Sequence, residues 1–315
     1  MNENFLGLIA APLTGFNQDG SIKIDIVESY VSMLKENHIS GAFVNGTTGQ
    51  GLQLSVEERK SLAECWVKSA PHGFRVIINV SHEDQSQSNL MAIHANNIGA
   101  NAVAVMVPSF KQKSVLDLVE YIQITADLVP NLPFYYYHIP TETKVFLPMI
   151  ELLKVSQNKI PNLAGIKYTH DDFSDFNLCR QFCNGEYDIM FGRDELLIDS
   201  LKIGAKTAVG STYNIMAPLY YELIKAFQSG DINLANELQE ISKNTCNLLY
   251  DTGSFRAGLK VIMRTIGIDL GQMRSPDLNI SSKKVKELEL SLKSIGVLKF
   301  FNKMEIEDTV RPARC

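Results

Sequence analysis

The chain of 315 residues lacks the features that mark several large classes of protein. It has no basic N-terminal segment leading into an apolar core, and no apolar run long enough to span a membrane, since the run at 5–13 is broken by Pro12. Its five cysteines are an odd number in a chain without a secretory signal. We therefore expect reduced thiols and a cytoplasmic protein.

Metal-binding and nucleotide-binding motifs are also missing. The six histidines are scattered, without an H-x-H or H-E-x-x-H pair, so metal chemistry has little support. Cys179 and Cys183 could share one helical face, but with no histidine nearby we expect them to pack in the core. No G-x-S-x-G elbow supports a serine hydrolase. The net charge of −5 gives no electrostatic footprint for nucleic acid or an anionic membrane.

What the chain does have is a regular alternation of short apolar runs and longer amphipathic stretches. Strands are expected at 5–11, 41–44, 76–80, 102–107, 133–137, 163–168, 189–191 and 207–209, each followed by a helical segment. Short, wholly apolar strands are typical of parallel sheets buried on both faces. Eight such units predict a (β/α)₈ TIM barrel, and a doubly wound sheet is the alternative.

The strand pattern stops after about Gly230. Three further helices are expected at 231–251, 254–267 and 281–295, and N-cap residues open the first two. We therefore divide the chain into a barrel at 1–230 and a C-terminal three-helix extension at 231–315. The extension is expected to pack on the barrel or to form subunit contacts, with a frayed polar tail at 305–315.

Lys167 is the most informative single residue, because it stands near the end of the apolar run 163–166. If that run is a buried strand, desolvation lowers the pKa of the amine and favours its neutral, nucleophilic form. A neutral lysine condenses with carbonyl compounds to form a Schiff base. The alternative is a lysine that leaves the strand end and points into water.

Other polar residues follow the expected strands, where a barrel carries its functional groups. The loop 46–51 has two glycines around two threonines, which suits either an anion such as a carboxylate or a plain glycine turn. In the run 135–137, Tyr135 and Tyr137 are expected on one face, and a tyrosine can carry protons. Asp194 and Glu195 either bind sugar hydroxyls or complement a helix dipole.

Two more polar segments stand at strand ends. His170-Asp171-Asp172 is the only candidate metal cluster, and we expect the aspartates to cap a helix instead. The small polar loop 210–214 is able to approach a ligand closely.

Four motifs together resemble a known family. They are Gly46-Thr47-Thr48-Gly49, Tyr137-His138-Ile139-Pro140, Gly165-Ile166-Lys167 and Gly210-Ser211. In order and spacing they are similar to those of the pyruvate-dependent class I aldolases, the N-acetylneuraminate lyase and dihydrodipicolinate synthase family. The resemblance covers essentially the whole barrel, and it is strongest to the animal-type lyase branch.

The resemblance implies a TIM barrel with a helical extension, assembled as a homotetramer, with no metal or organic cofactor. The implied reaction is reversible cleavage of N-acetylneuraminate into pyruvate and N-acetylmannosamine. Lys167 matches the Schiff-base lysine and Tyr137 the acid/base, while Thr47 and Thr48 match the residues that hold the substrate carboxylate. The candidate substrate-binding residues are Thr47, Thr48, Thr169, Gly192, Asp194, Glu195, Gly210 and Ser211.

Three positions depart from the family pattern. Gln50 stands where the glycine motif usually ends in glutamate, with little effect expected on the chemistry. Phe110 stands where many relatives carry a proton-relaying tyrosine. Glu142 would repel the carboxylated aldehyde of dihydrodipicolinate synthases, so it argues against that activity. It either contacts the substrate or faces solvent.

Two alternatives to the sialic acid lyase remain. One is another pyruvate-dependent aldolase that takes a different aldehyde. The other is a catalytically silent barrel that binds a keto acid or a sialic acid. The presence of both Lys167 and Tyr137 argues against the silent barrel, since binding alone needs neither a buried amine nor an aligned phenol.

Overall fold

The computed structural model of the chain describes residues 7–108 and 114–304. Eight parallel strands form a closed barrel in sequence order, and the first strand pairs with the last. The strands are β1 (Gly7–Ala10), β2 (Gly41–Val44), β3 (Arg75–Asn79), β4 (Ala102–Val105), β5 (Phe134–His138), β6 (Leu163–Tyr168), β7 (Asp188–Phe191) and β8 (Thr207–Gly210). Closure through β1 and β8 excludes the doubly wound sheet, which has two open edges. The barrel prediction is confirmed.

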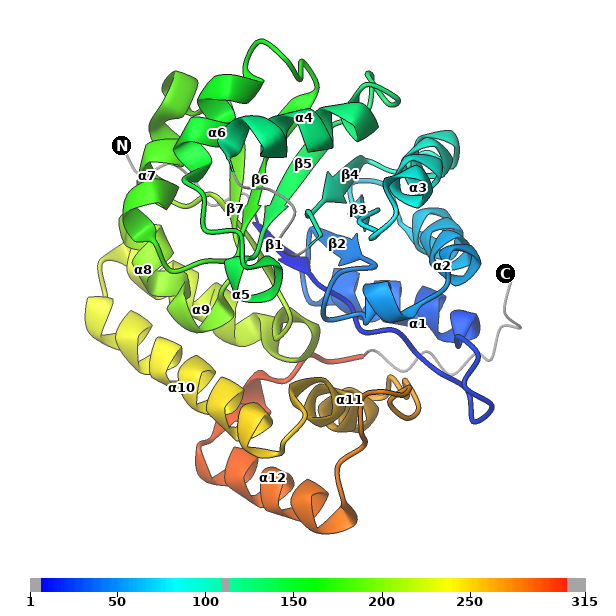
Figure 1. Cartoon of the computed structure of the whole chain (residues 1–315). Coiled ribbons are helices and arrows are strands. Elements are labelled where there is room, and N and C mark those ends of the chain that lie inside the picture. The colour runs from blue at the N-terminus through cyan, green and yellow to red at the C-terminus, as the bar shows by residue number, and fades with distance from the viewer. Residues whose placement is uncertain (1–6, 109–113, 305–315) are drawn as a thin grey trace.

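Helices follow the strands and surround the barrel (Figure 1). They are α1 (Val27–Glu36), α2 (Val56–Ser69), α3 (Gln85–Asn97), α4 (Val115–Ala126), α5 (Pro140–Thr143), α6 (Met149–Ser156), α7 (Phe173–Gln181), α8 (Leu197–Lys202) and α9 (Tyr213–Ser229). The predicted capping box before α2 is present, since Ser55 Oγ accepts from the Glu58 N–H and Glu58 accepts from the Ser55 N–H. This exchange satisfies two backbone donors and fixes where α2 begins.

Alternating side chains build two separate cores. Tyr135 and Tyr137 of β5 lie inside the barrel, in a cluster with Phe43 and Met190. Tyr136 points the other way, into the larger core between the strands and the helices. The predicted face of Tyr135 and Tyr137 is confirmed, and it follows from the two-residue period of a strand.

The three helices predicted for the C-terminal region are present. They are α10 (Ile232–Asp251), α11 (Phe255–Ile266) and α12 (Ser282–Ser294), and they lie together on one side of the barrel, yellow to red in Figure 1. Asp231 and Ser254 cap α10 and α11 as expected. Helix α10 packs along α9. The expected frayed tail at 305–315 lies outside the described residues.

Cys179 and Cys183 do not share a helical face, and the core packing expected of both is wrong for Cys183. Helix α7 ends at Gln181, and Cys183 has a left-handed backbone with φ of 48°, which turns it away from the helix. Cys179 is buried in the core as expected, whereas Cys183 is partly exposed. Among the described residues, none of the helices is long and apolar enough to cross a membrane.

Candidate active site

Lys167 lies inside the barrel near the carboxyl end of β6, and its side chain is buried. Its Nζ is 3.9 Å from the centroid of the Phe43 ring and 4.0 Å from that of Tyr137. Burial lowers the pKa of the amine to about 7, although the nearby Asp194 carboxylate acts in the opposite direction. The alternative of a lysine that points into water is excluded, and at neutral pH much of this amine is uncharged.

Tyr137 lies beside this amine on the neighbouring strand β5, in register with Lys167. Its ring packs edge-on against Phe43, and its hydroxyl is 3.4 Å from Thr47 Oγ1. Burial raises the pKa of the phenol to about 12. The hydroxyl is therefore protonated at neutral pH, and it becomes a base only when a nearby positive charge stabilises the phenolate.

The glycine-rich loop after β2 forms one wall beside Tyr137. Thr48 Oγ1 and Ser211 Oγ are 2.6 Å apart and share a hydrogen bond, which joins this loop to the loop after β8. A Cβ at Gly49 would lie 2.9 Å from the Pro12 carbonyl oxygen, so the close approach to the end of β1 requires glycine. The segment is thus a glycine turn that also presents two threonine hydroxyls to the cavity.

Asp194 is a buried carboxylate that opens a short 3₁₀ helix, η4 (Asp194–Leu196), after β7. One oxygen accepts hydrogen bonds from the Thr212 N–H at 2.7 Å and the Thr212 hydroxyl at 2.6 Å. Burial nevertheless raises the pKa of Asp194 to about 6. A Cβ at Gly210 would lie 1.8 Å from Asp194 Oδ1, so only glycine leaves room for this carboxylate.

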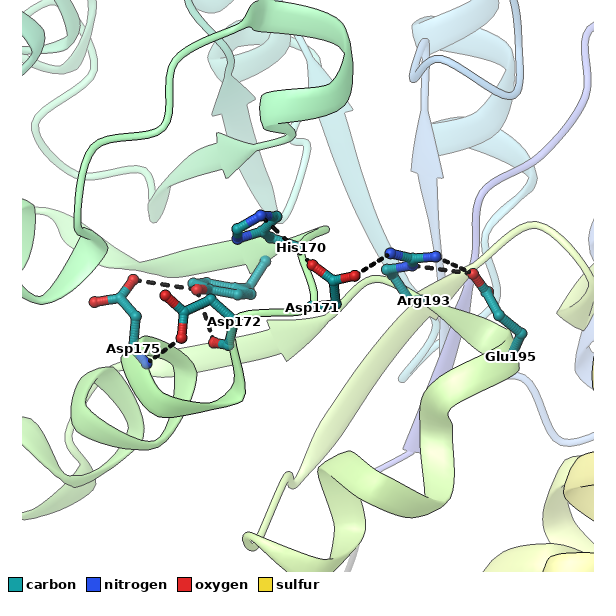
Figure 2. A network of polar contacts seen from close by, with 7 residues as sticks. His170, Asp171, Asp172, Asp175, Arg193 and Glu195 are labelled. Atoms are coloured by element: carbon teal, nitrogen blue, oxygen red, sulfur yellow. Dashed lines mark hydrogen bonds and ion pairs between the residues drawn. The ribbon is translucent and has the colours of Figure 1, made fainter.

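Glu195 is held by Arg193, as Figure 2 shows. Arg193 donates to Glu195 Oε1 from Nε at 3.0 Å and from Nη2 at 2.8 Å. Its Nη1 donates to Asp171 Oδ2 at 3.2 Å. The loops that follow β6 and β7 are therefore tied together by one guanidinium.

The two aspartates of the segment His170-Asp171-Asp172 have different roles. Asp172 accepts from the Asp175 N–H at 3.0 Å and caps α7, as predicted. Asp171 makes an ion pair with Arg193 instead, so a capping role is wrong for this residue. Its side chain points along the barrel mouth toward Arg193 rather than back onto the helix (Figure 2).

Thr169 and Gly192 extend the sheet beyond the strand ends. The Thr169 N–H donates to the His138 carbonyl, and the Gly192 N–H donates to the Tyr168 carbonyl, both at 2.8 Å. A Cβ at Gly192 would lie 2.1 Å from Thr169 Oγ1. Glycine at this position therefore lets the threonine side chain lie over the β7 end.

One cavity of about 720 Å³ brings all the predicted residues together at the carboxyl ends of the strands. The predicted residues on its wall are Thr47, Thr48, Tyr137, Lys167, Thr169, Gly192, Asp194, Glu195, Gly210 and Ser211. These ten residues supply one amine, one phenol, two carboxylates and four hydroxyls. Such a set can bind a polyhydroxylated carbonyl compound and can move protons at its reacting carbons.

The C-terminal helices supply wall residues that sequence reasoning missed. Arg256 of α11 makes an ion pair with Asp277, its Nε lying 2.8 Å from Asp277 Oδ2, and its Nη1 donates to the Thr47 carbonyl at 3.4 Å. Tyr250 and Leu278 line the same cavity. The sequence of this region does not predict that its residues line the cavity, because its patterns indicate only helix caps and apolar faces.

The three departures from the family pattern are placed as follows. Glu142 is an exposed residue of α5 that lines the cavity, and its charge contributes to the raised pKa of Tyr137. Gln50 is buried and donates to the Arg274 carbonyl, away from Lys167. It lines a neighbouring cavity of about 470 Å³ instead. Phe110 lies outside the described residues.

The fold and this site define a class: a TIM-barrel lyase with a buried lysine on the wall of its cavity. The chain belongs to the Dihydrodipicolinate synthetase family, whose model matches residues 4–295. It is 41% identical to N-acetylneuraminate lyase A of Xenopus laevis, over 86% of this chain and 90% of that protein. It is 37% identical to the human N-acetylneuraminate lyase, over 93% of each chain.

A solved structure agrees with these relatives. The N-acetylneuraminate lyase of Proteus mirabilis superposes with a TM-score of 0.89 at 36% identity, covering 94% of this chain and all of that one. Among the described residues, no group of three histidine, cysteine or acidic side chains converges as a metal site.

Proposed function

We propose that this chain is a class I aldolase that cleaves N-acetylneuraminate reversibly into pyruvate and N-acetylmannosamine. The observation that carries the proposal is the buried amine of Lys167, whose pKa is lowered to about 7, on the wall of a cavity that hydroxyls and carboxylates also line. The similarity to proteins named N-acetylneuraminate lyase supports the choice of substrate.

Lys167 would act as the nucleophile. Its neutral amine attacks the C2 ketone of the open-chain sugar acid, and loss of water leaves a protonated imine. This cation withdraws the electron pair of the C3–C4 bond, which becomes the double bond of an enamine. Protonation of the enamine at C3 and hydrolysis of the imine then release pyruvate and the free lysine.

Tyr137 would carry the proton of the 4-hydroxyl. In the unliganded site its raised pKa keeps the phenol protonated. The phenol would give its proton to the carbinolamine hydroxyl, which leaves as water. The positive charge of the imine on Lys167, about 4 Å from the ring, would then lower the pKa of Tyr137, so that the phenolate accepts the 4-hydroxyl proton as the C3–C4 bond breaks. In the reverse direction the protonated phenol would return the proton to the aldehyde oxygen.

Different wall residues would bind the two portions of the substrate. Thr47 and Thr48 stand next to Tyr137 and would hold the carboxylate of the pyruvate portion. Asp194 and Glu195 are acceptors on the same wall and would bind the hydroxyls of the sugar chain. The other residues proposed to contact that chain are Thr169, Gly192, Gly210 and Ser211.

A different aldehyde partner is the second candidate, and Glu142 on the cavity wall is the observation that favours it. A carboxylate at this position disfavours aldehydes that carry their own carboxylate. A silent binding barrel is the third candidate. The partly neutral amine beside an aligned phenol weighs against it, since neither is needed for binding alone.

We further propose a homotetramer in the cytoplasm, with the barrel at 1–230 and the helical extension at 231–315. Exposed apolar side chains on the outer helices, such as Leu90, Leu116, Ile124 and Leu178, support subunit contacts. Light scattering after gel filtration would give about four times 35.1 kDa for the tetramer, and a single-chain mass would contradict it.

The substrate is tested by incubating the protein with N-acetylneuraminate and measuring both pyruvate and N-acetylmannosamine. Equal amounts of the two products are expected. Pyruvate released only from other 4-hydroxy-2-keto acids would favour the second candidate. No product from any such acid, with sialic acid binding intact, would favour the silent barrel.

A further inference from the structure

Arg193 lies in the candidate active site, but the proposed mechanism assigns it no role. It follows β7, its side chain is 31% exposed, and it lines the same cavity as Lys167. Its guanidinium lies between the carboxylates of Asp171 and Glu195 (Figure 2). An arginine held by two acidic partners is not a free charge at the cavity mouth. It is a structural link between them.

The contact with Glu195 is one-sided. Two of the Arg193 donors, Nε and Nη2, donate to the same oxygen, Glu195 Oε1. We call this pair of hydrogen bonds the fork. Among the described residues no hydrogen bond ends on Oε2. A glutamate side chain has three rotatable bonds, so the fork fixes a carboxylate that would otherwise be mobile. The Oε2 atom keeps its capacity to accept hydrogen bonds from a ligand.

The other side of the link is anchored in the fold. Asp171 stands between Thr169, which continues β6, and Asp172, which caps α7 through the Asp175 N–H. The link between Asp171, Arg193 and Glu195 is therefore joined to β6, the strand that carries Lys167. Through Arg193, the loop that carries the sugar-binding acceptor is held at a set distance from the loop that carries the nucleophile.

We propose that Arg193 is a positioning residue that fixes the Glu195 carboxylate for the hydroxyl-bearing end of the aldehyde. This role rests on the proposed function and adds to it a determinant of aldehyde recognition. Arg193 acts through Glu195 and not on the pyruvate portion. Its removal should therefore weaken binding of the sugar and leave imine formation at Lys167 unchanged.

The condensation direction offers an internal comparison, because different wall residues are proposed to bind its two substrates. With Arg193→Gln, we expect KM for N-acetylmannosamine to rise about tenfold, the typical effect of losing a hydrogen bond to a charged group. KM for pyruvate and the rate of borohydride trapping with pyruvate should stay within about twofold of the wild type. A merely structural role would disturb both substrates.

A second variant separates positioning from direct contact. In the Glu195→Gln background, replacing Arg193 should change KM for N-acetylmannosamine by less than about twofold, since the residue through which it acts is already altered. Arg193→Lys keeps the charge but not the fork and should restore part of the affinity. Arg264→Gln, on an exposed turn of α11, is the matched control for charge and should change neither KM.

The possible outcomes are distinct. An undiminished effect of Arg193→Gln in the Glu195→Gln background would overturn the positioning role and assign Arg193 a direct substrate contact. Equal changes in both KM values, or no change in either, would also overturn it. Failure of the wild type to condense pyruvate with N-acetylmannosamine would overturn the proposed function, and this role with it.

Discussion

Lys167 Nζ lies 4.0 Å from the centroid of the Tyr137 ring, and the two residues are register partners on β6 and β5. Contact with the ring face favours the ammonium form, whereas burial favours the neutral amine. Burial is the larger effect here, since the pKa of Lys167 falls to about 7. Neighbouring strands thus bring a nucleophilic amine and a phenol side by side inside the barrel.

Replacing the nucleophile should separate activity from folding. Lys167→Ala should reduce cleavage of N-acetylneuraminate by about 10³-fold or more, because the covalent route is lost. Circular dichroism should remain that of the wild type, since the variant removes a buried amine to which no residue in 7–108 or 114–304 makes a hydrogen bond. Cleavage near the wild-type rate in this variant would remove Lys167 from the mechanism.

The chain offers a matched control in a second buried lysine. Lys260 of α11 also has its pKa lowered to about 7 by burial, but its Nζ donates to the carbonyls of Leu270 and Gln272 and does not line the cavity. Lys260→Met should keep imine formation with pyruvate while losing thermal stability, because two hydrogen bonds disappear. Loss of trapping in folded Lys260→Met would contradict the assignment of Lys167 as the nucleophile.

Tyr137→Phe should uncouple imine formation from bond cleavage. The amine of Lys167 remains buried, so borohydride trapping with pyruvate should persist. Cleavage should slow by about 10²–10⁴-fold, the usual contribution of a positioned acid or base. Single-turnover measurements would separate the two steps, and full cleavage activity would exclude Tyr137 as the proton carrier.

The lowered pKa of Lys167 also predicts a dependence on pH. The initial rate of imine formation should rise as the pH passes about 7 and level off above it, because only the neutral amine attacks. The free energy of unfolding should also rise with pH, for the same reason. The unfolded chain binds more protons than the folded one between about pH 7 and the ordinary lysine pKa near 10.4, so this residue destabilises most below pH 7.

Lys167→Met should therefore be more stable than the wild type at pH 6, and its advantage in Tm should shrink as the pH rises toward 10. Scanning calorimetry of both proteins across that range makes the comparison, and the shared background cancels other titrations. A constant difference in Tm would indicate that the lysine pKa is not lowered by folding.

Gly210 is expected to be essential for the Asp194 carboxylate. Gly210→Ala would place a Cβ 1.8 Å from Asp194 Oδ1 and push the carboxylate off Thr212. The loss of hydrogen bonds to a charged group should cost about 2–4 kcal/mol of unfolding free energy and most of the activity. Asp194→Asn, which keeps an acceptor for the Thr212 N–H, should lose less stability. Equal denaturation midpoints for Gly210→Ala and the wild type would contradict this packing.

Much of the site was predictable from the sequence, because in a TIM barrel the residues at the carboxyl ends of all the strands lie on one face. The carboxyl ends of parallel barrel strands meet at one face, so residues as distant as Thr47, Lys167 and Ser211 must converge once the strands are recognised. The two-residue strand period likewise put Tyr135 and Tyr137 on one face. These inferences need only local patterns and a closed topology.

What escaped prediction depends on tertiary packing. Arg256 and Asp277 reach the cavity because the C-terminal helices lie against the barrel, and helix caps and apolar faces do not specify where a helix docks. The pairing of Asp171 with Arg193 was missed for a related reason. An aspartate before a helix satisfies the pattern of a cap, and only the neighbouring loop reveals the stronger partner.

The most direct test of the account is borohydride reduction in the presence of pyruvate, followed by peptide mass analysis. A stable adduct of one reduced pyruvate on the peptide that contains Lys167, with Lys260 unmodified, is the predicted result. It should be absent without pyruvate and absent in Lys167→Ala. A folded wild-type protein that shows no adduct on Lys167, or carries it on another lysine, would contradict the Schiff-base mechanism.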